Sequence, residues 1–460
     1  MKKTVKFLVL LVCVQGMLGT ASKALPWAWA GPPLMIVGDS LGEGVQSADA
    51  NLRTQPYSYG VWVARQAGWN LVLPYIVSGP LGVVGDTSVR YRLFPYTTSS
   101  NLAVSGADSW SVLNDRALAS SPRAISNETE LVLFPRIGSQ IEIVEAVKPT
   151  TVLCWIGSND VLSAVLAFDQ LNSTQISLLM TRPEDFEKNY RELVSRLGAS
   201  AKQVVLADIP DVTHIGFLLD NDDLVRFLGP GNYLDEGSRT TVAALFSIRL
   251  GLADLSILQD PNYVLDSDET ALIQDRTNAL NQIIYETATQ YGFPVVNISE
   301  KFNQIAENPP YYSGVPITPR YLGGLFSLDG VHPSNIGHAL VANEFLSTLK
   351  VRYGWNVSTL NQSILNDIAA KDPFVDLDGD GRVRGRPLAG MLETLGPILG
   401  ISGDVNESIP ERTSKFMELS VEDRQEALNI LDTLRDPSAR GTTLWTPDQV
   451  RQVFRELFRL

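Results

Sequence analysis

A serine, a histidine and a carboxylate occur in this chain where they could act together as a nucleophile and its base. Ser40 lies in the stretch Gly38-Asp39-Ser40-Leu41-Gly42, which directly follows the apolar run at residues 34–37. His332 is one of only three histidines, and Asp329 precedes it by three residues in a loop that contains Gly330. A serine hydroxyl is a weak nucleophile until a base removes its proton, and a carboxylate can orient that base. The pattern predicts Ser40 as nucleophile, His332 as general base and Asp329 as the acid of a triad.

Two further segments could supply hydrogen-bond donors to an oxyanion. Asn159 lies in Gly157-Ser158-Asn159-Asp160, directly after the apolar run at residues 151–156, and carries a side-chain amide. Gly106 closes the stretch at residues 101–106, where the missing side chain lets a backbone N–H approach a substrate. With the backbone N–H of Ser40, these residues predict an oxyanion hole of Ser40, Gly106 and Asn159. Each short motif recurs by chance in caps and turns, but all of them in this order predict one catalytic site.

The elements that must position these residues follow from the apolar patterning. Short buried strands are predicted at residues 34–37, 70–76, 151–156, 203–207 and 294–298, and helices are predicted to begin near Pro183 and Ser267. Strands that alternate with helices indicate an α/β fold with a mostly parallel sheet covered on both faces. Because the carboxyl ends of parallel strands meet at one edge, Ser40 and Asn159 should emerge side by side.

The four motifs together resemble the sequence blocks of the GDSL, or SGNH, hydrolases. Gly38-Asp39-Ser40-Leu41, Gly106, Gly157-x-Asn159-Asp160 and Asp329-x-x-His332 carry the resemblance, which covers roughly residues 32–350 and is strongest to secreted bacterial members at residues 322–345. It implies a flavodoxin-like three-layer α/β/α sandwich and ester hydrolysis through an acyl-enzyme, with no required cofactor. It also implies the triad and oxyanion residues named above, and a structural role for Asp39.

One rival catalytic family shares part of this pattern. Gly38-x-Ser40-x-Gly42 also matches the nucleophile elbow of the α/β-hydrolases. That elbow follows several strands, and its acid lies on a separate loop from its histidine. Here the serine follows the first predicted strand and Asp329 lies three residues before His332, so we reject this alternative.

The composition of the chain predicts three parts. Three lysines precede an apolar run at residues 7–18, and small residues follow at Ser22-Lys23-Ala24, which is typical of a secretory signal peptide. We expect a signal peptide at residues 1–24 (or cleavage after Ala30), a hydrolase domain at residues 25–355 and a helical C-terminal region at residues 356–460. No later apolar stretch approaches the about 18 residues of a membrane span, so a secreted or periplasmic protein without a transmembrane segment is expected.

Charge and cysteine content exclude several classes. The net charge of −14 repels phosphate backbones, which argues against a nucleic-acid partner. Cys13 lies in the predicted leader, so Cys154 would have no disulfide partner and should pack as a small apolar residue. Three scattered histidines without cysteine pairs argue against a catalytic transition metal.

Two insertions leave the substrate open. Residues 213–263 are unusually apolar for a connection, which favours a wall or lid for an acyl chain, although extra helices packed on the sandwich would have the same composition. This favours a lipase or carboxylesterase that cleaves a small-molecule or lipid ester. Residues 79–100 predict a long surface loop whose aromatic residues could stack on sugars, so the alternative is a small-acyl carbohydrate esterase such as a polysaccharide deacetylase.

The C-terminal region has one candidate ion site and two amphipathic segments. Asp376, Asp378 and Asp380 alternate before Gly381 as in the first half of a calcium loop, but Pro387 stands where a bidentate glutamate is needed. A weakly bound structural Ca²⁺ and a solvated acidic turn both fit. Predicted helices near residues 420 and 446 need an apolar partner, either the catalytic domain or a cell surface. The second choice gives the alternative that the chain is a surface interaction protein.

Overall fold

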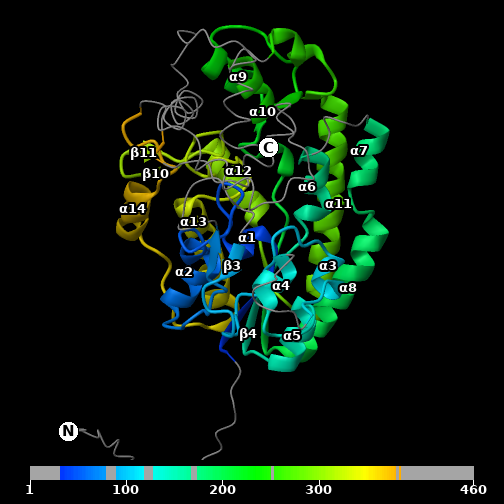
Figure 1. The fold of residues 1–460 in the computed structure, drawn as a ribbon, viewed down its shortest axis with the longest axis vertical. Helices are drawn as coiled ribbons and strands as arrows, with labels where there is room; N and C mark the ends of the chain where they lie inside the picture. Colours follow the sequence, from blue (N-terminus) through cyan, green and yellow to red (C-terminus); the bar gives the residue numbers. More distant parts are fainter. Residues whose placement is uncertain are drawn as a thin grey trace, which may run out of the picture. The chain divides into compact units, whose positions relative to one another are not determined.

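The computed structural model describes residues 32–78, 90–118, 128–166, 173–249, 253–379 and 383–384. Its centre is a parallel sheet of four strands in the order β1-β4-β5-β9. Helices lie on both sides of this centre (Figure 1). The strands are β1 (Leu34–Gly38), β4 (Thr151–Trp155), β5 (Gln203–Ala207) and β9 (Val295–Val296). All neighbouring pairs are parallel, so the carboxyl ends of the strands lie at one edge of the sheet.

A fifth segment runs along the free side of β1. Ile36 pairs in parallel with Asn101, and the backbone N–H groups of Leu102 and Val104 donate to the carbonyl groups of Ile36 and Gly38 at 2.9 and 3.1 Å. With this segment beside β1, the spatial order is that of the flavodoxin-like fold, in which the chain steps first to one side of β1 and then continues on the other. The predicted fold class is therefore confirmed.

The prediction of a strand of this sheet at residues 70–76 is wrong. Leu71 and Leu73 are buried as the apolar run requires, but the Val72 carbonyl accepts from the backbone of Ser100 and Asn101 in an irregular extended segment. A strand begins only at β2 (Ile76–Ser78), which pairs antiparallel with β3 (Arg90–Arg92). An apolar run predicts burial, whereas the pairing partner depends on residues far along the chain. Part of the predicted loop at residues 79–100 is thus a strand.

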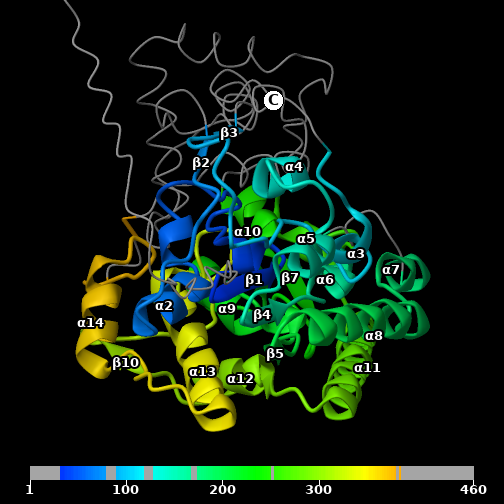
Figure 2. The ribbon, with the colours of Figure 1, turned by 90° about the horizontal axis from the view of Figure 1, so that it is seen from below.

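Helices cover both faces of the sheet because successive strand residues point to opposite sides and both sets are apolar. Val37 and Cys154 lie in one buried cluster, whereas Ile36 and Trp155 lie in the other. Figure 2 shows the strands between the two helical layers. One layer contains α5 (Gln140–Val147), α6 (Asn159–Leu166), α8 (Pro183–Ser200) and α11 (Ser267–Tyr291), and the other contains α2 (Tyr59–Gln66) and α13 (Asn335–Tyr353).

The apolar insertion folds as a small sheet with its own helices. Its strands form an antiparallel sheet in the order β6-β7-β8. Phe217 and Leu265 belong to the larger buried cluster, so the insertion packs on the domain. Its elements are β6 (Leu218–Leu219), α9 (Asn221–Leu228), β7 (Arg239–Thr241), α10 (Val242–Arg249) and η4 (Leu255–Gln259), and the third strand of the sheet, β8 (Val264–Leu265), directly follows the predicted bounds of the insertion.

The chain continues to share the domain core after α13. The helix α14 (Gln362–Lys371) contacts α13, and the carboxylate of Asp372 accepts from the backbone N–H of Ile336 at 2.7 Å. Phe374 and Val375 are buried in the same core. The first part of the region predicted as an appendage from residue 356 is therefore joined to the hydrolase core. The predicted leader, the predicted helices near residues 420 and 446, and Asp380 lie outside the described residues.

None of the described helices is both long and apolar enough to cross a membrane. Shorter elements connect the parts of the fold. They are α1 (Ser40–Glu43), η1 (Gln55–Tyr57), α3 (Ser111–Asn114), α4 (Glu128–Leu133), α7 (Ser173–Leu179), η3 (Val212–His214), α12 (Ile298–Glu307), β10 (Tyr311–Tyr312) and β11 (Val315–Pro316).

Candidate active site

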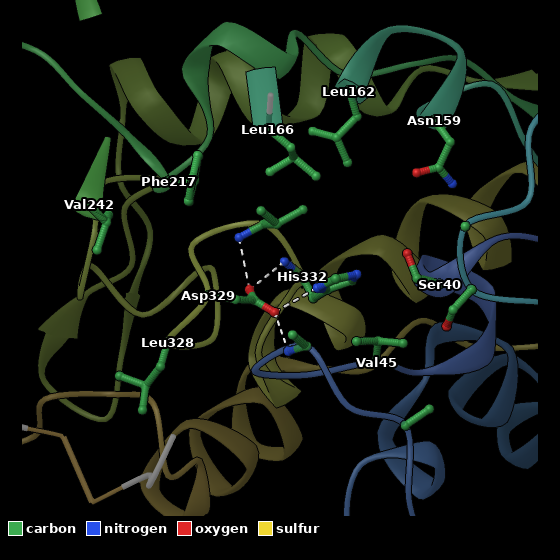
Figure 3. Close-up of a pocket in the computed structure, with 15 residues that line it drawn as sticks. Ser40, Val45, Asn159, Leu162, Leu166, Phe217, Val242, Leu328, Asp329 and His332 are labelled. Carbon is green, nitrogen blue, oxygen red and sulfur yellow. Dashed lines mark hydrogen bonds and ion pairs between the residues drawn. The ribbon is translucent and has the colours of Figure 1, made fainter. Parts of the chain in front are cut away.

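The five residues predicted from the sequence line one cavity. Ser40, Gly106, Asn159, Asp329 and His332 all border a pocket of about 210 Å³ (Figure 3). Ser40 follows β1, Gly106 follows the extended segment beside β1, and Asn159 begins α6 after β4. These three residues therefore leave neighbouring strands at the same edge of the sheet, where open α/β sheets bind their ligands.

The turn that carries Ser40 is held on both sides. Asp39 caps α1, and its carboxylate accepts from the backbone N–H of Leu41 at 2.9 Å. The backbone N–H and carbonyl of Gly38 each form a 2.9 Å hydrogen bond with the side-chain amide of Gln140. A side chain at Gly38 would collide with the carbonyl oxygen of Trp155, so the end of β1 has room only for glycine.

Asp329 and His332 are in direct contact on the loop before α13. The Nδ1 atom of His332 lies 2.6 Å from Oδ2 of Asp329. The carboxylate also accepts from the backbone N–H groups of Ala48 (2.6 Å), Val331 (2.9 Å) and His332 (2.9 Å), and from the Ser327 hydroxyl (3.1 Å). Burial raises the pKa of Asp329, but the charge and hydrogen bonds of His332 and the other donors more than offset it and hold the pKa below its ordinary value.

The orientation of His332 follows from this contact. Figure 3 shows the imidazole of His332 between Asp329 and Ser40 across the floor of the pocket. With Nδ1 donating to the carboxylate, Nε2 is the ring atom that can accept a proton.

Two buried carboxylates hold the loop at residues 105–109 in place. The sequence did not predict this role for either of them. Glu43 accepts from the backbone N–H and the hydroxyl of Ser105 at 2.7 and 2.6 Å. Asp160 accepts from the backbone N–H and the hydroxyl of Ser109 at 2.9 and 2.7 Å. Each carboxylate anchors one end of the loop that contains Gly106. The partners are 62 and 51 residues apart in the chain, so no local pattern indicates the pairing.

Gly106 and Asn159 present different kinds of donor. Gly106 has a φ of 78°, and no atom lies within 4 Å of the position that a Cβ would take, so its backbone is open toward the pocket. The Asn159 side chain donates to the carbonyl of Ala107 at 2.8 Å, which orients the amide. Because an amide carries two N–H donors, this bond leaves a second donor for a ligand.

A family model described as GDSL-like Lipase/Acylhydrolase matches residues 34–345. The chain belongs to this family. The match begins at β1 and ends within α13, and it spans Ser40, Gly106, Asn159, Asp329 and His332. Membership makes the protein a GDSL acylhydrolase, that is, an ester hydrolase.

Solved structures with a similar fold include several hydrolases. One is an α/β hydrolase enzyme from the metagenome of Lake Arreo, Spain, with 16% identity and a TM-score of 0.35 over 69% of this chain and 95% of that chain. Another is a phospholipase A1 from Streptomyces albidoflavus NA297, with 16% identity and a TM-score of 0.35 over 70% of this chain and 100% of that chain. A third is an acetyl-xylooligosaccharide esterase from Geobacillus, with 15% identity and a TM-score of 0.33 over 70% of this chain and 94% of that chain. Comparison with curated protein sequences gives no match. Similarities of this size carry no information on the substrate of this GDSL acylhydrolase.

The remaining lining of the pocket is apolar. Figure 3 shows Leu162 and Leu166 of α6, with Phe217 and Val242 of the insertion, along the wall of the cavity. The other apolar lining residues are Val45, Ala48, Ala50, Leu328 and Val331. Apart from the catalytic candidates and Ser105, the lining is therefore apolar, and Phe217 is its aromatic hydrocarbon side chain.

The other two histidines do not line this cavity. His338 is fully buried, and burial lowers its pKa to about 3, so it packs as a neutral ring. His214 is half exposed, and its Nδ1 lies 2.9 Å from Asp211. In the part of the chain that the structure describes, no cluster of three or more His, Cys, Asp or Glu residues is arranged to hold a metal ion. The calcium loop, which includes Asp380, stays a prediction.

Proposed function

We propose that this GDSL acylhydrolase is a secreted serine esterase that forms an acyl-enzyme on Ser40. The observation that carries the proposal is the 2.6 Å contact between Asp329 and His332 in the pocket that Ser40 also lines. His332 removes the proton from the Ser40 hydroxyl, whose oxygen attacks the ester carbonyl. The oxyanion that forms accepts hydrogen bonds from the backbone N–H groups of Ser40 and Gly106 and from the Asn159 amide.

The second half of the cycle uses the same groups. His332 gives its proton to the leaving alcohol as the C–O bond breaks, which leaves the acyl group on Ser40. Water then attacks the acyl carbonyl with His332 as base, and the acid is released with Ser40 restored. Neither half requires a cofactor.

The apolar wall supports a lipase or carboxylesterase activity. A carbohydrate esterase for small acyl groups is the competing substrate class. The described aromatic residues that would favour it, Phe94 and Tyr96, are exposed but do not line the pocket. An aliphatic ester is therefore the substrate class that we propose.

The test is hydrolysis of a p-nitrophenyl ester series, from acetyl to palmitoyl, by the mature protein beside Ser40→Ala. We expect activity in the first and a loss of at least about 10⁴-fold in the variant. Activity that survives in a folded Ser40→Ala protein would rule out this nucleophile. A preference for acetyl would favour the carbohydrate esterase, and a folded but inert wild type would favour the surface interaction protein.

Export is a separate part of the proposal, and it rests on the basic and apolar leader at residues 1–24. Expression of the full chain in a bacterial host, followed by N-terminal sequencing of the exported protein, tests it. We expect a mature terminus at Leu25, and uncleaved protein in the cytoplasm would contradict export.

A further inference from the structure

The insertion supplies two side chains to the ester pocket. Phe217 precedes β6 and is 2% exposed, and Val242 is the first residue of α10 and is also 2% exposed. Both line the cavity that contains Ser40. They lie between β5 and α11, outside the sequence blocks that carry the catalytic residues.

The two residues form one continuous surface. The backbone N–H of Val242 donates to the carbonyl of Phe217 at 3.0 Å. Next to this bond, Leu218 of β6 pairs with Thr241 of β7. The side chains of Phe217 and Val242 are therefore held at adjacent positions by the small sheet of the insertion.

A backbone hydrogen bond joins this surface to the loop that carries Asp329 and His332. The backbone N–H of Phe217 donates at 2.9 Å to the carbonyl of Gly330, which lies between Asp329 and His332. Gly330 has a φ of 69°, and a side chain there would collide with the backbone nitrogen of Phe217. The contact is thus backbone against backbone, with no space between the two segments.

A second set of contacts holds the insertion to the segment that leads into this loop. The guanidinium of Arg226 on α9 donates to the carbonyl of Tyr321 at 2.6 Å. Arg320 reaches back to Asp223 on α9 at 3.2 Å. The insertion is therefore attached both at Gly330 and at a second point about ten residues before it, which is unlike a lid that opens on a hinge.

We propose that Phe217 and Val242 form a fixed end wall that sets the acyl-chain length, and that the substrates are esters of aliphatic acids with about six to eight carbons. This inference rests on the proposed function. An apolar cavity of about 150 Å³ holds benzene, a molecule of six carbons, and the pocket here is somewhat larger at about 210 Å³. Each methylene buried before the wall should raise kcat/KM about fourfold, and longer chains should gain nothing further.

The experiment measures kcat/KM across the p-nitrophenyl ester series for the wild type, Val242→Ala and Val242→Phe. We expect the optimum to move to longer chains by about two carbons in the first variant and to shorter chains in the second, since the wall moves back or forward. The ratio of kcat/KM for each longer ester to kcat/KM for the acetyl ester reports the shift, because acetyl does not reach the wall. Phe217→Leu should give a smaller shift toward longer chains.

Phe246→Leu is the matched control, because Phe246 is buried on the same helix, α10, but does not line the pocket. It should leave the chain-length optimum unchanged. An optimum that stays unchanged in both Val242 variants would overturn the wall. Failure of the proposed function looks different, because either the wild type would then hydrolyse no ester or folded Ser40→Ala would keep the activity.

Hydrogen exchange tests whether the wall is fixed. The Phe217 amide, which donates to Gly330, should exchange as slowly as the amides of β1 in the free enzyme. Exchange that is at least a hundredfold faster than in β1 would show that the insertion opens as a lid and would contradict a fixed wall.

Discussion

Asp39 is fully buried and the Asp329 side chain is only 9% exposed beside the candidate active site, yet their surroundings have opposite effects on their charge. Asp329 accepts from three backbone N–H groups and a hydroxyl, and it faces the ring of His332. Asp39 accepts from Leu41, and its Oδ2 atom has no hydrogen-bond partner among the described residues. The pKa of Asp329 is held below its ordinary value, whereas burial raises the pKa of Asp39 to about 7.

The comparison shows that burial alone does not decide whether a carboxyl group is ionised in this enzyme. The number of hydrogen-bond donors and a direct contact with His332, which only Asp329 has of these two, decide it. Asp160 is intermediate, because burial raises its pKa to about 6 even though Ser109 donates to both of its oxygens. The surroundings of Asp329 thus favour its charged form, whereas Asp39, which caps the turn of Ser40, is mostly neutral below pH 7.

The largest expected effect separates the two carboxylates directly. Asp329→Asn should lower kcat by about 10⁴-fold, because an amide neither selects the required tautomer of His332 nor stabilises its positive form. Asp39→Asn, measured at pH 6, should stay within about tenfold of wild type, because a neutral side chain already dominates there. Steady-state hydrolysis of an aliphatic ester checks both variants, with melting temperatures as the folding control. Equal losses at the two positions would break the comparison.

The next effect concerns the oxyanion side of the pocket. Asn159→Ala should lower kcat by about 10²–10³-fold, the usual loss for one oxyanion donor. Ser163→Ala is the control, since Ser163 lies one turn further along α6 and is exposed. Full activity of Asn159→Ala would remove this residue from the oxyanion hole.

Glu43 should have a smaller effect, because it acts through the loop that it anchors. Glu43→Gln keeps the shape but weakens the hydrogen bonds to Ser105, so the Gly106 N–H is less well placed and kcat should fall about tenfold with KM little changed. Glu142→Gln, which alters a residue that caps α5 and pairs with Arg116, should leave kcat unchanged. A rise in KM without a fall in kcat would show that Glu43 shapes substrate binding instead.

The smallest effect is on stability and not on turnover. The folded pKa of Asp39 is about 7 and its ordinary value is 3.8, so the unfolded chain loses this proton first as the pH rises. Between pH 4 and pH 7 this group therefore reduces the free energy of unfolding, by about 2–4 kcal/mol in total. Asp39→Asn removes the effect, and its melting temperature relative to wild type should rise by several degrees across this range. A difference that is independent of pH would mean that Asp39 is ionised in the folded state.

The parts of the fold that were predicted correctly are those that local patterns encode. β1, β4 and β5 begin and end within one residue of the predicted runs, because strands buried on both faces are continuously apolar. The five proposed site residues could be named from the sequence because each sits in a short motif next to such a strand or in a glycine-containing loop. The insertion was recognised as apolar, but its three-stranded sheet was not predicted, since its strands have only two or three residues each.

The parts that escaped prediction depend on contacts between distant residues. Nothing near Gln140 in the sequence indicates that its amide pairs with Gly38, 102 residues away. The same holds for Glu43 with Ser105. Residues 70–76 show the complementary error, because an apolar run can be buried beside a sheet without forming a strand in it.

The absence of a side chain at Gly330 has a consequence for how such enzymes can be recombined. The insertion cannot be exchanged between relatives as a self-contained cassette, because its first residues rest on a backbone position in a distant loop that must remain glycine. A recipient with any larger residue at that position would push the transplanted segment away from its own catalytic loop. Chimeras that carry both segments together should fold and function, and libraries that shuffle them independently should be depleted of active members.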